Sequence, residues 1–238
     1  MKLKMLAVVI ILVLVLGILW YLNMDKQNSI NTDQVSKSEG EITYIAIGDS
    51  YTIGNGVLDS ERWPNILVKN LRAEGIDIEL IANPAVSGYT VEDAIRNELP
   101  QIKKLQPDFV TVLIGANDNF GQIPVNTYAQ DLKELLDKLQ PMLNNPQNIV
   151  LVTIPDYSKS PAGGGYETAG VSKSIEEYNR IIKEEAEKRG LRVADIFPVS
   201  QTMTSADDYI SDGLHPSAQG YAKWEKVIFP VVFELLKK

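Results

Sequence analysis

Short apolar segments that alternate with helix-like segments are the feature that most constrains the fold of this chain. The segment Phe109–Ile114 (FVTVLI) shows the pattern most clearly, because apolar or β-branched residues fill it from end to end. Strands of this kind are buried on both faces, which is typical of parallel sheets covered by helices on each side. The other predicted strands are Ile42–Ile47, Ile76–Ala82, Ile149–Ile154 and Leu191–Ile196.

The segments between the strands carry apolar residues at helical spacing. In Tyr128–Leu139, for example, Leu132, Leu135, Leu136 and Leu139 fall on one helical face. The other predicted helices are Pro64–Ala73, Val91–Leu105 with a break at Pro100, Ser172–Arg189, and Ala218–Leu236 with a kink at Pro230. The sequence therefore predicts an α/β fold with three α/β/α layers and a mostly parallel, five-stranded, flavodoxin-like sheet.

An apolar run near the start of the sequence is a separate feature. Met5–Leu22 holds 18 residues without a charge, and a helix of that length reaches about 27 Å, close to the hydrocarbon thickness of a bilayer. Lys2 and Lys4 precede the run, and Trp20 and Tyr21 lie at its far end. This arrangement is typical of a membrane segment whose positive end stays in the cytoplasm.

The run predicts that residues 1–22 are an N-terminal membrane anchor and that the rest of the chain lies outside the cytoplasm. A cleaved signal peptide, which would give a secreted protein, is the alternative, although the run is longer than a usual signal core and no A-x-A-like site follows it. Residues 23–40 are polar and are predicted to be a linker. Residues 41–238 are then the folded domain, which is long enough to bury a core.

The residue inventory excludes several classes of chemistry. The chain has no cysteine and one histidine, so it forms no disulfide, thiol nucleophile, iron–sulfur cluster or multi-histidine metal site. With 23 basic and 31 acidic residues its formal net charge is −8, and an acidic chain without a basic block is a poor ligand for nucleic acid. We expect no metal, no organic cofactor and no nucleic-acid partner, which leaves oxygen-based catalysis or binding without catalysis.

Four polar segments follow predicted strands or lie in the last loop of the domain. They are Gly48–Thr52, Asn83–Gly88, Gly115–Asp118 and Asp212–Pro216. Each segment taken alone is explained equally well as a turn or a helix cap. Because the carboxyl ends of parallel strands share one edge of a sheet, the four segments together predict a single site.

The four segments resemble the sequence blocks of the GDSL, or SGNH, hydrolase family, in which Ser50, Gly88, Asn117 and His215 match the four named positions. The resemblance spans about residues 45–225. It implies the SGNH hydrolase fold, a serine hydrolase that cleaves carboxylic esters, and no cofactor. No G-x-S-x-G surrounds Ser50, so the nucleophile elbow of α/β-hydrolases is absent.

The residue types in these segments suit acyl transfer. A serine hydroxyl becomes a nucleophile when a base takes its proton, and His215 is the only imidazole in the chain that can serve Ser50. Asp212 lies three residues before His215 across a turn, a spacing that lets its carboxylate orient the imidazole. Ser50, Asp212 and His215 are therefore the predicted catalytic residues.

The family resemblance also implies an oxyanion hole. Its three donors are the backbone N–H of Ser50, the backbone N–H of Gly88 and the side-chain amide of Asn117. In other enzymes one such donor stabilises the transition state by about 3–4 kcal/mol. Asp49 and Asp118 are expected to order these loops rather than to react.

The resemblance allows several substrates. A membrane anchor favours a small-molecule or lipid ester, such as a lysophospholipid, and the alternative is an O-acetyl group on cell-envelope polysaccharide. In a different class, the Ser-, Thr- and Gly-rich loop Asp49–Gly56 is compatible with a flavodoxin-like module that binds phosphate or FMN without catalysis. That interpretation leaves Asn117, Asp212 and His215 without a role. A catalytically inactive family member is a further alternative, and the sequence predicts no oligomeric state.

Two loops have alternative interpretations. Tyr157–Gly170 contains three consecutive glycines and follows a predicted strand, so it is either a mobile loop over the substrate or an ordinary surface insertion. Ile53–Val57 either shapes the acyl pocket or merely permits the turn into the following helix.

Overall fold

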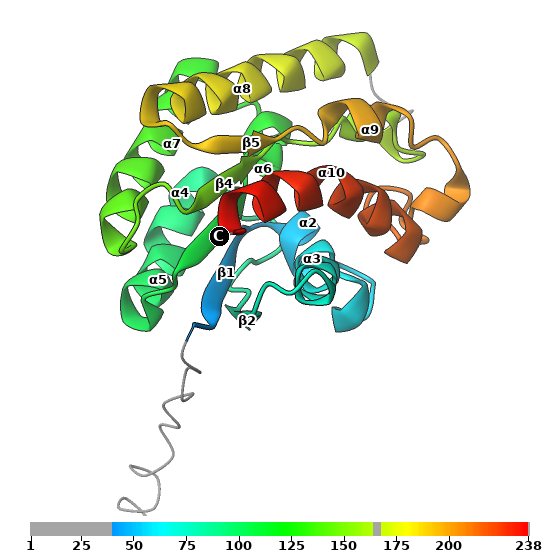
Figure 1. Ribbon diagram of the computed structural model, residues 1–238. Coiled ribbons are helices and arrows are strands. Elements are labelled where there is room, and N and C mark those ends of the chain that lie inside the picture. Colours follow the sequence, from blue (N-terminus) through cyan, green and yellow to red (C-terminus); the bar gives the residue numbers. More distant parts are fainter. Residues whose placement is uncertain (1–39, 164–167, 238) are drawn as a thin grey trace, which may run out of the picture. The chain divides into compact units, whose positions relative to one another are not determined.

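A parallel sheet of five strands in the order β2-β1-β3-β4-β5 forms the centre of the folded domain (Figure 1). The computed structural model describes residues 40–163 and 168–237. The strands are β1 (Ile42–Gly48), β2 (Ile78–Ala82), β3 (Phe109–Leu113), β4 (Ile149–Val152) and β5 (Arg192–Ala194). Every neighbouring pair in the sheet is parallel, so the prediction made from the apolar strand segments is confirmed.

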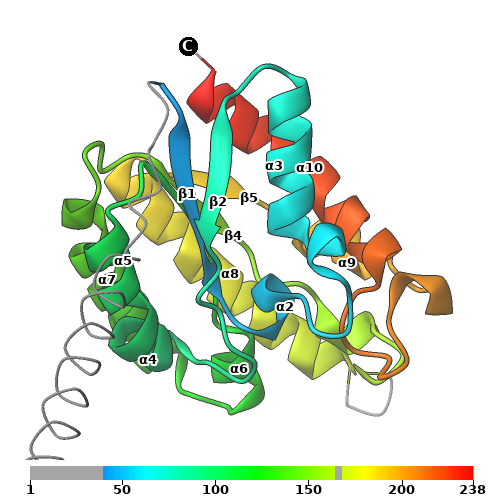
Figure 2. The ribbon, with the colours of Figure 1, turned by 90° about the horizontal axis from the view of Figure 1, so that it is seen from below.

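Helices cover both faces of the sheet (Figure 2). One face carries α3 (Trp63–Ala73) and α10 (Ala218–Leu236), which pack against each other. The other face carries α4 (Val91–Asp93), α5 (Leu99–Leu105), α7 (Val125–Leu139) and α8 (Thr168–Arg189). Three short helices follow the carboxyl ends of strands: α2 (Ser50–Ile53), α6 (Ala116–Phe120) and α9 (Phe197–Gln201). The predicted three-layer α/β/α fold is therefore confirmed.

The register between β1 and β3 fixes the edge of the sheet from which the polar loops leave. Ile47 of β1 lies beside Val112 of β3, and Gly48 lies beside Leu113. Both strands end at this second pair. The loop before α2 and the loop before α6 therefore leave the sheet next to each other.

The helical segment predicted over Val91–Leu105 is irregular directly before Pro100. Ala94–Glu98 forms π-helical turns between α4 and α5, and Pro100 is the second residue of α5. Proline lacks the N–H that would bond to the preceding turn, so an irregular turn on its N-terminal side is the expected consequence. Pro230 lies inside α10, as predicted.

The predicted anchor (residues 1–22) and most of the predicted linker (residues 23–40) lie outside the described residues, and both stay predictions. Among the helices that the structure does describe, none combines the length and the apolar character needed to cross a bilayer. Residues 164–167 of the glycine-rich loop also lie outside the described part of the chain.

Gly48 lies where β1 meets the turn that carries Ser50. An ideal Cβ on Gly48 would lie 2.2 Å from Oγ1 of Thr52 and 2.5 Å from the carbonyl oxygen of Leu113. We expect Gly48→Ala to lower the free energy of unfolding by about 1–3 kcal/mol, the usual cost of overpacking, as measured by urea denaturation.

The matched control is Gly170→Ala in α8, where an added Cβ meets no atom within 4 Å. This variant should be as stable as the parent or up to about 1 kcal/mol more stable, because alanine favours a helix over glycine. Equal stability of the Gly48 variant and the parent protein would contradict the close packing described here.

Candidate active site

A cavity of about 260 Å³ lies at the carboxyl edge of the sheet. It is lined by Ser50, Tyr51, Asn55, Ser87, Gly88, Ala116, Asn117, Phe120, Tyr157, Ala162, Leu214 and His215. The structure therefore brings together the four residues that the sequence had placed in separate segments: Ser50, Gly88, Asn117 and His215. These four come from the segments that follow β1, β2 and β3 and from the loop before α10.

Ser50 is presented by a sharp turn from strand to helix. It is the first residue of α2, two residues after the end of β1. The side chain of Asp49 caps this helix by accepting a hydrogen bond of 2.9 Å from the backbone N–H of Tyr51. At the other end, Gly54 adopts the left-handed conformation and its N–H donates to the carbonyl oxygen of Ser50. Hydrogen bonds thus cap α2 at both of its ends. Ser50 lines the cavity and is 8% exposed.

Asp212 and His215 form a hydrogen-bonded pair. The imidazole Nδ1 lies 2.6 Å from Oδ2 of Asp212. The other carboxylate oxygen of Asp212 accepts from the backbone N–H groups of Leu214 and His215, at 2.8 and 3.0 Å. Burial opposes ionisation of Asp212, but these hydrogen bonds outweigh it and lower the pKa of the carboxyl group. When Nδ1–H of neutral His215 donates to Asp212, the opposite nitrogen, Nε2, is left free to accept a proton.

The loop around His215 is itself fixed by backbone contacts. The N–H of Ile210 donates to the carbonyl oxygen of His215 at 2.9 Å, and Tyr209 and Pro216 form an antiparallel bridge. The ring of Tyr51 lies against the imidazole, with 5.5 Å between the ring centroids. The residue after Ser50 therefore packs on the ring of the candidate base, a contact that the sequence analysis did not foresee.

Asn117 is the second residue of α6, which follows β3, and Gly88 lies in the loop after β2; both line the cavity. The amide Nδ2 of Asn117 donates to the carbonyl oxygen of Tyr89 at 2.9 Å, and it lies 3.4 Å from Oδ2 of Asp49. Gly88 has a φ of +85°, and an added Cβ would meet no atom within 4 Å. Glycine is therefore required here by the backbone conformation rather than by crowding.

The predicted loop Tyr157–Gly170 reaches the site in its described part. Tyr157 and Ala162 line the cavity, and the N–H of Ala162 donates to the carbonyl oxygen of Gly213 in the histidine loop. In the second loop, Ile53–Val57, Asn55 lines the cavity and accepts a hydrogen bond of 2.8 Å from the hydroxyl of Ser87.

Three buried carboxyl groups lie behind the candidate catalytic residues. Asp49, Asp118 and Glu98 all have no exposed surface. Asp118 accepts from the backbone N–H of Val91 at 3.2 Å, which ties the start of α4 to the Asn117 loop. Glu98 accepts from the backbone N–H of Gly48 at 3.1 Å. Asp49, Asp118 and Glu98 thus each hold a backbone N–H near the candidate site, and Glu98 was not singled out from the sequence.

A signal for Glu98 was present in the sequence. Val91, Ala94, Glu98 and Ile102 follow one another at helical spacing, and all four are fully buried. A carboxyl group on an otherwise apolar helical face indicates a buried partner. In this structure that partner is the amide at the end of β1.

Burial controls the ionisation of these carboxyl groups. It raises the pKa of Glu98 to about 8 and that of Asp118 to about 6. Burial also raises the pKa of Asp49 to about 7. The hydrogen bond from Tyr51 acts to lower this pKa, and the nearby carboxyl group of Asp118 acts to raise it. The site therefore combines Asp212, whose carboxyl group ionises readily, with three acids that keep their protons to a higher pH than usual.

Comparison with known proteins places the chain in a family. The pattern of the GDSL-like Lipase/Acylhydrolase family matches residues 46–223, and the chain belongs to this family. Proteins of this family hydrolyse ester or acyl bonds, so the chain is an ester or acyl hydrolase. Membership also confirms the predicted SGNH hydrolase fold.

Individual relatives agree with this assignment. An arylesterase of Vibrio mimicus is 24% identical over 76% of this chain and 84% of its own length. A multidomain esterase of Ruminococcus flavefaciens is 33% identical over 128 residues, which are 52% of this chain and 15% of that protein; the chain thus spans a small part of this relative. The solved structure of an acetylxylan esterase from Geobacillus stearothermophilus shares the fold, with a TM-score of 0.65 and 21% identity over 81% of this chain and 95% of that one.

The buried acids generate a prediction about stability and pH. In the unfolded chain a glutamate titrates near its usual pKa of about 4.3, whereas Glu98 titrates at about 8 in the folded protein. Between these values the folded state holds a proton that the unfolded state has released. The stabilisation is therefore complete below the unfolded pKa and is lost as the pH rises toward 8, with a slope of at most about 1.4 kcal/mol per pH unit for one group.

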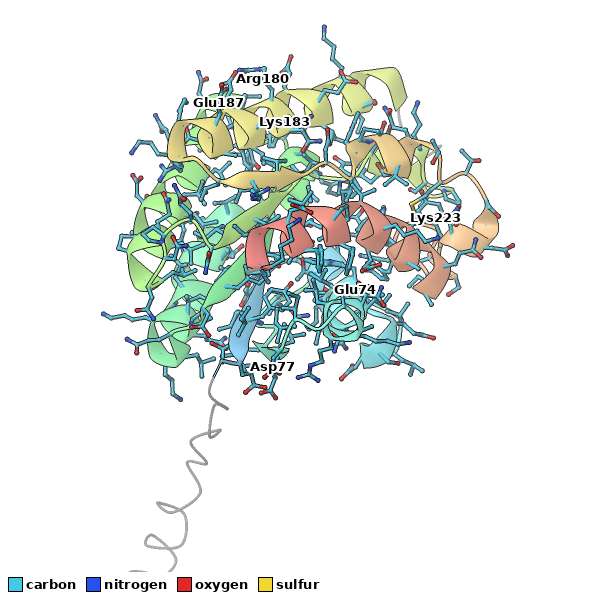
Figure 3. All side chains as sticks on the ribbon, in the orientation of Figure 1. Glu74, Asp77, Arg180, Lys183, Glu187 and Lys223 are labelled. Carbon is cyan, nitrogen blue, oxygen red and sulfur yellow. The ribbon has the colours of Figure 1, made fainter. Side chains whose placement is uncertain are left out.

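We expect the free energy of unfolding to fall between pH 5 and pH 8, and Glu98→Gln to reduce this fall, as measured by urea denaturation at each pH. Glu187→Gln is the control, because Glu187 is exposed on the outer side of α8 (Figure 3). A Glu98 variant with the same pH dependence as the parent protein would show that Glu98 is ionised at neutral pH.

Proposed function

We propose that this protein is a serine esterase that hydrolyses short-chain carboxylic esters through an acyl-enzyme on Ser50. The observation that carries the proposal is the 2.6 Å contact between Asp212 and Nδ1 of His215, in a loop that lines the same cavity as Ser50. An imidazole held in this way has its second nitrogen available as a base. The flavodoxin-like alternative gives this pair no role.

In the first step the Ser50 hydroxyl attacks the ester carbonyl carbon and its proton passes to Nε2 of His215. Negative charge then develops on the carbonyl oxygen. The donors proposed for this oxyanion are the backbone N–H groups of Ser50 and Gly88 and the amide of Asn117. Asp212 stabilises the imidazolium that forms, and the lowered pKa of this carboxyl group keeps it ionised for that purpose.

In the second step the tetrahedral intermediate collapses. The imidazolium of His215 gives its proton to the leaving alcohol, and the acyl group stays on Ser50. Water then attacks the acyl-enzyme with His215 again acting as the base, and the carboxylic acid is released.

The surroundings of Asn117 suit its role as a donor. One N–H of the amide is held by the carbonyl oxygen of Tyr89, while the nitrogen lies 3.4 Å from the Asp49 carboxyl group. A protonated carboxyl group accepts hydrogen bonds less strongly than a carboxylate. Because burial raises the pKa of Asp49 to about 7, protonation of Asp49 weakens this long contact, and the second N–H of Asn117 can then turn to the oxyanion.

The size and walls of the cavity support short acyl groups. Its volume of about 260 Å³ lies below the roughly 300–1,000 Å³ of typical sites for drug-sized ligands. Phe120, Tyr157 and Leu214 contribute apolar surface to it. A short acyl chain fills such a space, whereas the long acyl chain of a lipid extends beyond it.

Removal of the candidate nucleophile or base tests the mechanism. Ser50→Ala and His215→Ala should each lower kcat for p-nitrophenyl acetate by at least about 10³-fold, with little change in the thermal melt. Ser87→Ala is the matched control, because its hydroxyl lines the same cavity but donates to Asn55. This variant should retain activity within about 10-fold of the parent. Undiminished hydrolysis by the Ser50 variant would refute the mechanism.

The acyl preference is tested with p-nitrophenyl acetate, butyrate, octanoate and palmitate. We expect kcat/KM to be highest for acetate or butyrate and at least about 10-fold lower for palmitate, because the cavity does not enclose a long chain. The same detergent concentration in all assays keeps the series comparable. The highest kcat/KM for palmitate would instead favour the lipid substrate expected from the sequence.

A further inference from the structure

A second cavity adjoins the candidate active site. Its volume is about 310 Å³, and its lining consists of Asn119, Phe120, Gln122, Tyr157, Gly170, Val171 and Ser174. Phe120 and Tyr157 line both cavities. The two aromatic residues therefore form the boundary between the place where the ester would react and the second cavity.

Phe120 is exposed at this boundary. It is the last residue of α6, three positions after Asn117, and it is 61% exposed. Its ring packs with the ring of Tyr157 at a tilt of 66°, with 6.4 Å between the centroids. A large aromatic side chain kept at the surface beside a reactive site offers a flat apolar face to a ligand.

Three residues that line the second cavity are joined by hydrogen bonds. The hydroxyl of Tyr157 donates to Oδ1 of Asn119 at 2.7 Å, and Nδ2 of Asn119 donates to Oγ of Ser174 at 2.8 Å. Asn119 is 7% exposed. These contacts fix the orientation of the amide and leave the Ser174 hydroxyl with its own proton to donate. This part of the lining is therefore polar, and its hydrogen bonds fix it before any ligand arrives.

Gln122 also lines this cavity. It is exposed and has a φ of +54°, a left-handed conformation that is uncommon for a residue other than glycine. Its side-chain amide adds one group that can both donate and accept hydrogen bonds.

Charge distinguishes between classes of ligand. None of the seven described residues that line the second cavity is acidic or basic. A charged headgroup would find no counter-charge among them, so its desolvation would not be compensated by an ion pair. Neutral hydroxyl groups, in contrast, match the hydroxyl of Ser174 and the amide of Gln122.

We propose that the second cavity binds the alcohol part of the substrate and that this alcohol is a neutral, hydroxyl-rich ring such as a sugar. One face of the ring packs on Phe120, and its hydroxyl groups bind Gln122 and Ser174. The inference rests on the proposed function, because a short acyl group in the first cavity directs the leaving alcohol across Phe120.

The test compares three acetate esters that differ only in the alcohol. They are methyl 6-O-acetyl-glucopyranoside, ethyl acetate, whose alcohol is too small to reach the second cavity, and acetyl-glycerophosphocholine, whose alcohol is charged. We expect kcat/KM of the parent protein to be at least about 10-fold higher for the sugar ester than for either of the others.

Two variants localise the effect. Phe120→Ala should lower kcat/KM for the sugar ester by about 10-fold and that for ethyl acetate by a clearly smaller factor, because Phe120 lines both cavities. Gln122→Gly should act in the same direction, and glycine favours the φ of +54° at this position, so the variant should fold well. Leu58→Ala is the matched control, because Leu58 is an apolar residue that is 69% exposed and lines neither cavity.

The outcomes separate the inference from the proposed function. Selective loss of sugar-ester activity in both variants supports the inference. Hydrolysis of ethyl acetate with no preference for the sugar ester, or equal losses on both esters, overturns the inference and leaves the esterase in place. No hydrolysis of any of the three esters by the folded parent protein overturns both.

Discussion

The close approach of β1 to β3 at Gly48 is the constraint on which the candidate site depends. The two strands end side by side, and there is no room for a Cβ between Gly48 and the Leu113 carbonyl. Because both strands stop at this level, Ser50 and Asn117 leave the sheet on neighbouring loops. The short helix α2, capped by Asp49, then turns the Ser50 side chain toward the cavity rather than along the sheet.

Two kinds of carboxyl group serve this arrangement in opposite ways. Asp212 receives hydrogen bonds from its own loop and from His215, so it stays ionised beside the imidazole. Asp49 and Glu98 are buried without a basic partner among their described hydrogen bonds, and burial raises their pKa values to about 7 and 8. Their neutral forms add no negative charge next to the place where the oxyanion is proposed to develop. The position of each acid, rather than its residue type, thus sets its charge.

Much of the fold could be predicted from the sequence, because parallel strands buried on both faces leave uninterrupted apolar segments. The leucine spacing in Tyr128–Leu139 similarly predicts α7, since it places the buried side chains on one helical face. Pro100 correctly marked an irregular place in the second helical segment, but the sequence does not reveal that the irregularity takes the form of π-helical turns over Ala94–Glu98.

For the candidate site, the sequence predicted which segments meet but not how they contact one another. Short motifs identified the segments that meet at the cavity, because each motif lies directly after a strand or in the last loop. The packing of Tyr51 on His215, the support of Gly48 by Glu98 and the second cavity beyond Phe120 were not predicted. Each of these depends on a contact between loops that are distant in the sequence, and periodicity within one segment carries no information about such contacts.

The central claim is that Ser50 becomes covalently acylated with His215 as its base. The most direct measurement is mass spectrometry of the peptide that contains Ser50 after the protein has reacted with a fluorophosphonate. The account predicts one adduct, located on Ser50, that does not form in the Ser50→Ala variant and forms much more slowly in the His215→Ala variant. An adduct on a different residue, or labelling of Ser50 at the same rate without the imidazole, would contradict it.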